Sequence, residues 1–153
     1  MHGTYRIVVG VDGTDGARRA FRWALRHAAR RAGTVQAVIA WTRGDGDDVD
    51  ARDRAVEVLA REVNDAIRDF EPPPQVAWEA VQGRPARVLT HADRDADLLV
   101  LGSHGNGRAH HAALGSVSEE CIRYTACPVV VVPLPRPGRE LLPEEPALRQ
   151  PAT

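Results

Sequence analysis

The chain has 153 residues, of which 43% are hydrophobic and 27% charged, and 20 basic against 21 acidic residues give a formal net charge of -1. This length suits a single domain with its own core, and the balanced charge gives no general attraction to nucleic acids or acidic membranes. All 20 basic residues are arginines, which excludes both a phosphate-binding Walker lysine and a Schiff-base lysine.

Cysteine content and hydropathy narrow the class of protein further. The two cysteines, Cys121 and Cys127, are too few for a disulfide framework or a four-cysteine zinc site. Cys121 is expected on the buried face of a helix and Cys127 at a partly accessible position, without the CxxC spacing of a redox pair. No apolar run approaches the ~20 residues that span a membrane, and no signal peptide is evident. We therefore expect a cytoplasmic protein with neither a membrane nor a nucleic acid among its partners.

Apolar runs alternate with helical patterns along the chain, and turn residues separate them. The first half predicts a strand, a helix with arginines on its outer face, a second strand, and a second helix stopped by three prolines. Gly33 is expected to end the first helix as its C-cap, and the acidic segment 44–48 is expected to be a surface loop. These elements are expected at residues 5–11 (strand), 15–32 (helix), 35–41 (strand) and 56–70 (helix).

The second half continues the alternation. Pro85 is expected in the first turn of a short helix, where its missing N–H costs nothing. Residues 133–153 hold six of the eleven prolines and show no apolar period, so we expect a folded domain over 1–133 and a disordered tail over 134–153. The remaining elements are expected at residues 76–81 (strand), 83–92 (helix), 97–101 (strand), 116–125 (helix) and 128–132 (strand).

Strands that alternate with helices predict an α/β fold, with a parallel sheet covered by helices on both faces. In such doubly wound sheets, ligands bind beyond the carboxyl ends of the strands, where the strand order reverses. If the first and fourth strands flank that point, Asp12 and Gly102 become neighbours at one site.

The most informative motif is Gly102-Ser103-His104-Gly105, followed after nine residues by Gly115-Ser116. Glycines let the backbone approach an anion closely, and the helix that follows presents unpaired N–H groups and the positive end of its dipole. This layout is typical of a phosphate cradle, and it predicts nucleotide binding without a lysine.

Five segments, in order along the chain, resemble the universal stress protein family over roughly residues 4–133. The resemblance implies a five-stranded parallel sheet with strand order 3-2-1-4-5. It also implies the ATP-binding branch of the family, which the full glycine motif marks, and dimerisation through the edge strand Val129–Val132. The segments are Val9-Gly10-Val11-Asp12-Gly13-Thr14, Val38-Ile39-Ala40-Trp41, the stretch Leu99-Val100-Leu101-Gly102-Ser103-His104-Gly105, Leu114-Gly115-Ser116-Val117-Ser118-Glu119 and Cys127-Pro128-Val129-Val130-Val131-Val132.

By position, the resemblance assigns contacts with ATP to individual residues. Asp12 would accept hydrogen bonds from the ribose or lie near Mg²⁺ bound to the phosphates. The backbone of Ala40 would read the adenine edge, and Leu101 would pack on the base. The residues expected to approach the phosphates or donate to them are Gly102, Gly105, Arg108, Gly115, Ser116, Val117 and Ser118, and Gly10 and Ser103 complete the candidate site.

Several of these residues also have a structural explanation that the sequence leaves open. Asp12 can form an Asx-turn with Thr14 or cap the first helix. Ser116 and Glu119 have the spacing of a capping box, and Gly115 can simply end a loop. Arg108 fits a solvated position as well as a phosphate contact.

Two further clusters do not have the spacing of a metal site. His110 and His111 are adjacent and so would not share one face, and neither they nor His104 have a carboxylate or cysteine at a ligand-like interval. The acidic run 45–50 lacks the glycine and the terminal glutamate that a calcium loop requires, so we expect a solvated, flexible segment.

The sequence offers little for catalysis, with neither a nucleophile elbow nor a paired histidine and carboxylate in one loop. We therefore expect a nucleotide-dependent regulatory module of the stress response with an unidentified protein partner. The alternatives are a weak ATPase or phosphotransferase, and a dimeric interaction protein without physiological nucleotide binding. A homodimer is expected because a bare apolar edge strand invites aggregation.

Overall fold

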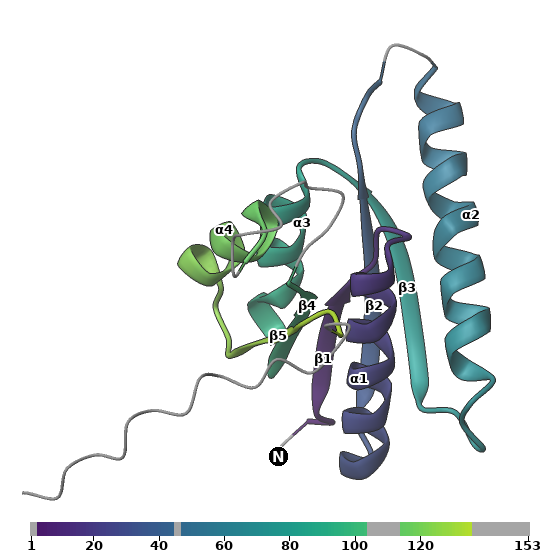
Figure 1. The fold of residues 1–153 in the computed structure, drawn as a ribbon, viewed down its shortest axis with the longest axis vertical. Coiled ribbons are helices and arrows are strands. Elements are labelled where there is room, and N and C mark those ends of the chain that lie inside the picture. Colours follow the sequence, from purple (N-terminus) through teal and green to yellow (C-terminus); the bar gives the residue numbers. More distant parts are fainter. Residues whose placement is uncertain (1–2, 45–46, 104–113, 136–153) are drawn as a thin grey trace, which may run out of the picture.

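The computed structural model describes residues 3–44, 47–103 and 114–135, and Figure 1 shows their fold. Five strands form one parallel sheet in the order β3-β2-β1-β4-β5, which confirms the expected fold class and strand order. The strands are β1 (Arg6–Gly10), β2 (Thr34–Trp41), β3 (Gln75–Gln82), β4 (Leu98–Gly102) and β5 (Val129–Val132), and the helices are α1 (Asp15–Arg31), α2 (Asp48–Ile67), α3 (Pro85–Ala92) and α4 (Ser116–Tyr124).

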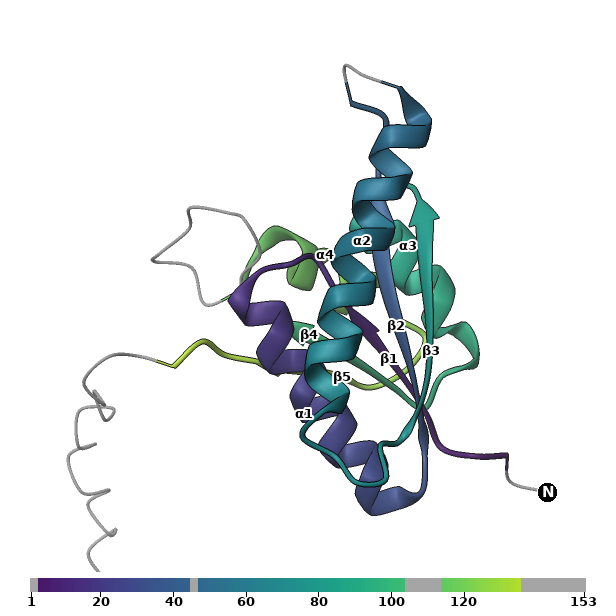
Figure 2. The same cartoon turned by 90° about the vertical axis from the view of Figure 1, so that its right-hand side faces the viewer.

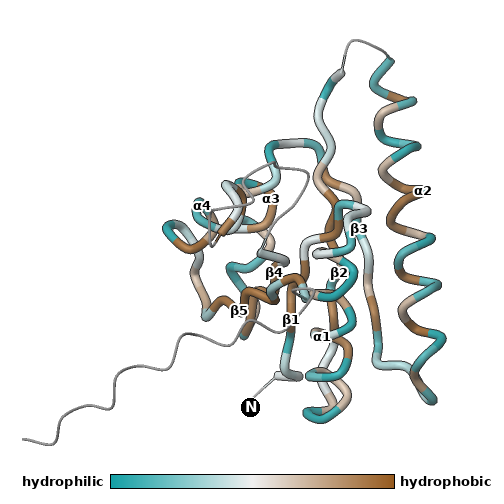
Figure 3. The backbone as a smooth tube through the Cα atoms, viewed as in Figure 1, coloured by the Kyte–Doolittle hydropathy of each residue, from teal (hydrophilic) through white to brown (hydrophobic). Residues whose placement is uncertain are grey.

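Helices cover both faces of the sheet, α1 and α2 on one and α3 and α4 on the other (Figure 1). The first pair packs on a core cluster that includes Phe21 and Leu59, and the second on a smaller cluster that includes Leu89 and Cys121. Figure 3 shows hydrophobic colour along the central strands and along the sides of the helices that face them. No helix in the described ranges is both long enough and apolar enough to cross a membrane.

The strands end at different heights along the carboxyl edge of the sheet. The pairing of β1 with β2 ends at Gly10 opposite Val38, whereas β2 and β3 stay paired as far as Trp41 opposite Gln82. Figure 2 shows β2 and β3 continuing beyond β1, together with the N-terminal part of α2. The last residues of β2 therefore have β3 on one side and no β1 partner on the other.

The end of α1 differs from the expectation. The residue in the left-handed conformation is Ala32, with φ 50°, and not Gly33. Gly33 is needed for another reason, because a Cβ there would lie 2.6 Å from the carbonyl oxygen of Tyr5. That oxygen accepts the N–H of Thr34 at 2.8 Å. Gly33 therefore lets β2 start beside β1.

α2 begins earlier than its apolar stripe indicates. Asp47 is the N-cap, and its carboxylate accepts the N–H of Val49 at 3.3 Å. Asp48 and Asp50 lie in the first turn, where negative charge is favoured by the helix dipole. The expected loop over 44–48 is therefore wrong for its last residue, which is helical, and residues 45–46 lie outside the described ranges. The helix also ends before Phe70.

An aromatic cluster holds the C-terminal half of α1 against the start of β1. His27 stacks on Trp23 with ring centroids 4.8 Å apart, and the guanidinium of Arg31 lies 4.7 Å from the centre of the Tyr5 ring. Burial lowers the pKa of His27, and the charges of Arg31 and Arg30 lower it further. The folded protein therefore favours the neutral imidazole.

The free energy of unfolding is expected to fall as the pH is lowered below 6.5, the ordinary pKa of histidine, because the unfolded chain then binds a proton that the folded chain resists. We expect His27→Phe, which keeps a ring against Trp23, to remove this part of the pH dependence. Urea unfolding at about pH 7.5 and about pH 5 measures the effect. An unchanged difference between the two pH values in the variant would contradict this role of His27.

Candidate functional site

The segments that follow β1 and β4 meet at the carboxyl edge of the sheet. β1 and β4 are neighbours, with Val9 paired to Val100, and the chain continues from them to helices on opposite faces. Continuing this register by two residues places Gly102 beside Val11, which immediately precedes Asp12. The structure therefore brings Asp12 and Gly102 to one switch point, where doubly wound sheets bind their ligands.

Asp12 shapes the turn that leads into α1. Its Oδ1 accepts the N–H of Thr14 at 2.9 Å and also the Thr14 hydroxyl, which confirms the Asx-turn. Thr14 is the N-cap of α1, and its hydroxyl accepts the N–H of Ala17 at 3.3 Å. Between them Gly13 has φ +81°, a conformation that favours glycine. Asp12 is exposed, and within the described ranges both of its hydrogen bonds use Oδ1, which leaves Oδ2 for a ligand.

Gly102 is required for the packing of α1 against β4. A Cβ at this position would lie 2.8 Å from both the carbonyl carbon and the oxygen of Gly16, and 3.2 Å from the nitrogen of Ala17. These are backbone atoms, which cannot move aside as the end of a flexible side chain can. The sequence interpretation related Gly102 to the approach of a ligand and missed Gly16, although a glycine in the first turn of a helix was a signal for close packing.

Two hydrogen bonds join the ends of the segment between β4 and α4. The N–H of Gly115 donates to the carbonyl of Ser103 at 2.5 Å, and the Ser118 hydroxyl donates to the carbonyl of Gly102 at 2.8 Å. The N–H of Ser103 donates to the carbonyl of Val132 at 3.1 Å, which ties the same point to β5. A hydroxyl has one proton, so Ser118 uses its donor to hold the site together rather than to bind phosphate in this arrangement.

The first turn of α4 presents backbone donors beside the end of β4. Its N-cap is Gly115, with φ −75° and ψ 167° and no side-chain capping bond, so the capping box expected from Ser116 and Glu119 is wrong. The N–H of Glu119 donates to the carbonyl of Gly115 at 3.0 Å and closes the first turn of the helix. The N–H groups of Ser116, Val117 and Ser118 therefore have no acceptor within the helix, and with the helix dipole they favour an anion.

The backbone of Ala40 faces the open side of β2. The carbonyl of Val38 accepts the N–H of Val11 at 2.9 Å, and the carbonyl of Trp41 accepts the N–H of Gly83 at 2.8 Å. Backbone groups of successive strand residues point to alternate sides. Val38 therefore faces β1 and Trp41 faces β3, so Ala40 faces the side of β1, past the point where the pairing with β1 ends. A ligand there can hydrogen-bond to both the N–H and the C=O of Ala40.

Gly10 and Leu101 lie beneath this site, on the side of α3. Leu101 is 4% exposed and belongs to the smaller core cluster. A Cβ on Gly10 would lie 3.1 Å from Cδ1 of Leu89 and 3.4 Å from Cδ2 of Leu101. Both residues therefore contribute to the floor of the site, and contact between Leu101 and a base stays a prediction.

The segment between Ser103 and Leu114 lies outside the described residues. In the described part of the chain, no group of three or more His, Cys, Asp or Glu side chains could hold a metal ion. Mg²⁺ near Asp12 therefore stays a prediction that depends on a bound nucleotide. The sequence-predicted residues that fall in this undescribed segment are His104, Gly105, Arg108, His110 and His111.

The side chains behind α4 are structural. Cys121 is fully buried as expected, and burial, with the charges of Asp93 and Glu120, raises its pKa to about 12. Burial also raises the pKa of Cys127, and both cysteines are free thiols. Asp93, which the sequence interpretation missed, is fully buried and accepts the hydroxyl of Thr125 at 2.6 Å. This bond joins the end of α3 to the segment before β5. The two residues are 32 positions apart, so no local sequence pattern could indicate their contact.

The fold defines the chain as a doubly wound α/β domain with its switch point between β1 and β4, the place where sheets of this kind bind ligands. The family model described as "Universal stress protein family" matches residues 4–133. The chain belongs to the universal stress protein family.

Individual relatives agree with this assignment. The chain is 32% identical over 128 residues to the universal stress protein Rv2624c of Mycobacterium tuberculosis (strain H37Rv), a match that covers 82% of this chain and 47% of that protein. The chain therefore spans about half the length of the curated relatives it matches. A universal stress protein solved in complex with cAMP is similar with a TM-score of 0.69 and 26% identity, covering 84% of this chain and 96% of that one. The Archaeoglobus fulgidus protein solved in complex with dAMP has a TM-score of 0.65 and 26% identity, covering 83% and 96%.

Proposed function

We propose that this chain binds an adenine nucleotide, with ATP as the expected ligand, at the switch point between β1 and β4. The observation that carries the proposal is the first turn of α4, where three backbone N–H groups without helical acceptors lie beside Gly102 and near the Asp12 turn. The complexes of two related proteins with cAMP and dAMP support an adenine nucleotide as the class of ligand.

The described residues fit such a ligand. The N–H groups at the start of α4 suit phosphate oxygens, and Oδ2 of Asp12 suits a ribose hydroxyl or a phosphate-bound Mg²⁺. The N–H and C=O of Ala40 match the adjacent acceptor and donor on the edge of adenine. We infer that the bound nucleotide acts as a regulatory signal in the stress response by altering contacts with a protein partner.

Release of nucleotide from the purified protein tests this proposal. The protein is denatured, and the supernatant is analysed by liquid chromatography and mass spectrometry. Adenine nucleotide in proportion to the protein is the expected result. No nucleotide, together with no thermal shift at about 1 mM ATP, would contradict the proposal and leave a dimeric interaction protein. Conversion of added ATP to ADP would instead favour the weak ATPase.

We also propose that two copies pair through β5. The carbonyls of Pro128 and Val132 accept N–H groups of Leu99 and Ser103 in and beyond β4, at 2.9 and 3.1 Å. Because strand residues alternate, the N–H and C=O groups of Val129 and Val131 point away from β4, toward the outer edge of the sheet. Antiparallel pairing with the same edge of a second copy would satisfy these groups, and a two-fold axis would close the assembly.

Val131→Pro is expected to convert the dimer into a monomer without unfolding it. Proline removes the N–H of Val131, which points outward, and leaves the hydrogen bonds between β5 and β4 intact. Light scattering coupled to size exclusion, at tens of micromolar protein, measures the change. Val131→Ala, which keeps the N–H, is the control and is expected to stay dimeric. A dimeric, folded Val131→Pro protein would show that the copies meet elsewhere.

A further inference from the structure

The outer face of α1 carries a continuous row of arginines. Arg19, Arg22, Arg26 and Arg30 follow one another at intervals of three and four residues, so they share one face, opposite the buried face of the helix. All four are exposed. We call this row the arginine ridge, and at 1.5 Å per residue it is about 16 Å long.

The charge of the ridge is only partly compensated. Arg22 forms an ion pair with Asp69, whereas Arg19, Arg26 and Arg30 form none with any residue of 3–44, 47–103 or 114–135. Like charges three or four residues apart repel each other and destabilise a helix. The helix dipole favours a cation only in the last turn, at Arg30. An acidic segment bound along the ridge would remove this repulsion.

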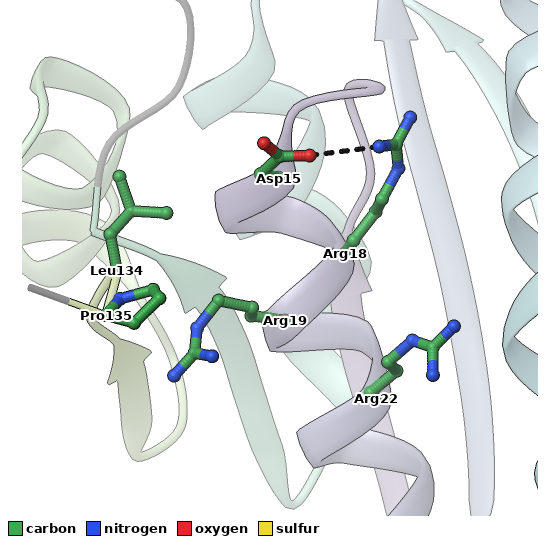
Figure 4. Close-up of a pocket in the computed structure, with 6 residues that line it drawn as sticks. All are labelled: Asp15, Arg18, Arg19, Arg22, Leu134 and Pro135. Carbon is green, nitrogen blue, oxygen red and sulfur yellow. Dashed lines mark hydrogen bonds and ion pairs between the residues drawn. The ribbon is translucent and has the colours of Figure 1, made fainter. Parts of the chain in front are cut away.

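The chain reaches the ridge directly after β5. Nε of Arg19 donates to the carbonyl of Pro133 at 3.2 Å. In Figure 4, the Arg19 side chain points toward Leu134 and Pro135. The last described residues therefore already lie against the N-terminal end of the ridge. They line a hollow of about 460 Å³ together with residues of α1, and the full lining is Asp15, Arg18, Arg19, Arg22, Leu134 and Pro135.

We propose that the arginine ridge is the docking surface for residues 140–145 of the same chain. This segment, Glu140-Leu141-Leu142-Pro143-Glu144-Glu145, carries three carboxylates and no basic residue, so its charge is opposite to that of the ridge, whereas Arg136 and Arg139 lie in the stretch that connects it to Pro135. An extended chain spans at most about 3.5 Å per residue, so the stretch from Pro135 to Glu140 is long enough for the acidic segment to reach any arginine of the ridge. Exposed ion pairs are individually weak, but a short tether holds the segment at an effective concentration in the millimolar range.

A spin label near the acidic segment tests this docking in the full chain. Ala147→Cys is combined with Cys127→Ser, and the nitroxide is attached to the new thiol, since Cys121 is fully buried. We expect the backbone amide signals of α1 at Arg26 and Arg30 to lose intensity relative to those of β3. The loss is expected to disappear at about 1 M salt, where the screening length is only about 3 Å.

Charge reversal tests whether the contact is electrostatic. Glu140→Arg, Glu144→Arg and Glu145→Arg together are expected to restore the signals of α1. Adding Arg19→Glu, Arg26→Glu and Arg30→Glu to that variant is expected to bring the broadening back. The matched control reverses three exposed arginines on other elements, Arg87, Arg94 and Arg123, and is expected to leave the broadening of the wild-type segment unchanged.

Three results would overturn the proposal. One is equal intensity at α1 and β3 in the labelled protein, and another is broadening that survives both charge reversal and salt. The third comes from mixing isotope-enriched, unlabelled protein with spin-labelled protein of natural isotope abundance. Broadening of α1 in that mixture would mean that the segment of a second copy, rather than of the same copy, occupies the ridge.

Discussion

Gly115→Asp is expected to abolish retention of adenine nucleotide while leaving the protein folded. Gly115 has φ −75°, which any residue adopts, and it is the N-cap of α4 without a capping side chain. An aspartate there can accept the N–H groups of the first turn itself and would repel a phosphate. A ligand that loses two charge-assisted hydrogen bonds, each worth about 1.5 kcal/mol, binds roughly 100-fold more weakly.

The effect of this substitution on nucleotide affinity can be distinguished from an effect on the stability of the fold. An N-cap aspartate in place of glycine changes helix stability by only a few tenths of a kcal/mol, so the thermal midpoint without ligand is expected to stay nearly constant. Gly44→Asp introduces the same charge at an exposed position where a Cβ meets nothing within 4 Å, and it is expected to keep the nucleotide. Calorimetric titration with ATP measures both variants. Wild-type affinity in Gly115→Asp would place the phosphates away from α4.

Gly102→Ala is expected to destabilise the fold, by about 1–3 kcal/mol or more. The added Cβ would lie 2.8 Å from two backbone atoms of Gly16, so either α1 or β4 must shift. A shift of β4 also moves the carbonyl of Gly102, which holds Ser118. Weaker nucleotide binding is therefore expected as a secondary effect.

Gly44→Ala is the matched control for this substitution, because its Cβ would meet nothing within 4 Å. It is expected to be neutral or slightly stabilising, since alanine restricts the unfolded chain. Urea unfolding of the two variants, with unchanged slopes, measures the difference in the free energy of unfolding. Similar midpoints for Gly102→Ala and Gly44→Ala would show that α1 can move away from β4 at little cost.

The glycine motif illustrates how far a linear pattern can be interpreted. Its spacing correctly predicted that a strand ends at the first glycine of the motif and that a helix begins after the last one. The pattern treats Gly102 and Gly115 alike, as positions where a ligand approaches. In the structure, position 102 requires glycine because the backbone of α1 packs directly against it. The backbone conformation of Gly115, in contrast, can be adopted by any residue. The distinction depends on Gly16, which lies far from Gly102 in the chain.

Fold class could be predicted because it depends on periodicity, which is a local property, whereas the strand order was only implied by the resemblance to the family. Runs such as Leu98–Leu101 and helical stripes such as Ala17–Ala28 mark buried faces wherever the chain then goes. Helix ends were less well predicted. Capping at Ala32, at Asp47 and at Gly115 depends on the turn geometry of one or two residues, and several residue types can satisfy it.

Composition and order along the chain alone excluded lysine chemistry and predicted the parallel α/β sheet. They placed the Asp12 turn beside the glycine motif only on the condition that the first and fourth strands flank the switch point. The direction in which Ala40 presents its backbone, the use of the Ser118 hydroxyl on Gly102 and the approach of residues 133–135 to α1 emerged only from the folded chain. The last two are contacts of about 3 Å between groups that are distant in the sequence, and the first depends on where the neighbouring strand β1 ends. Periodicity specifies which face of an element is buried, but it carries no information on which atoms of another element will meet that face.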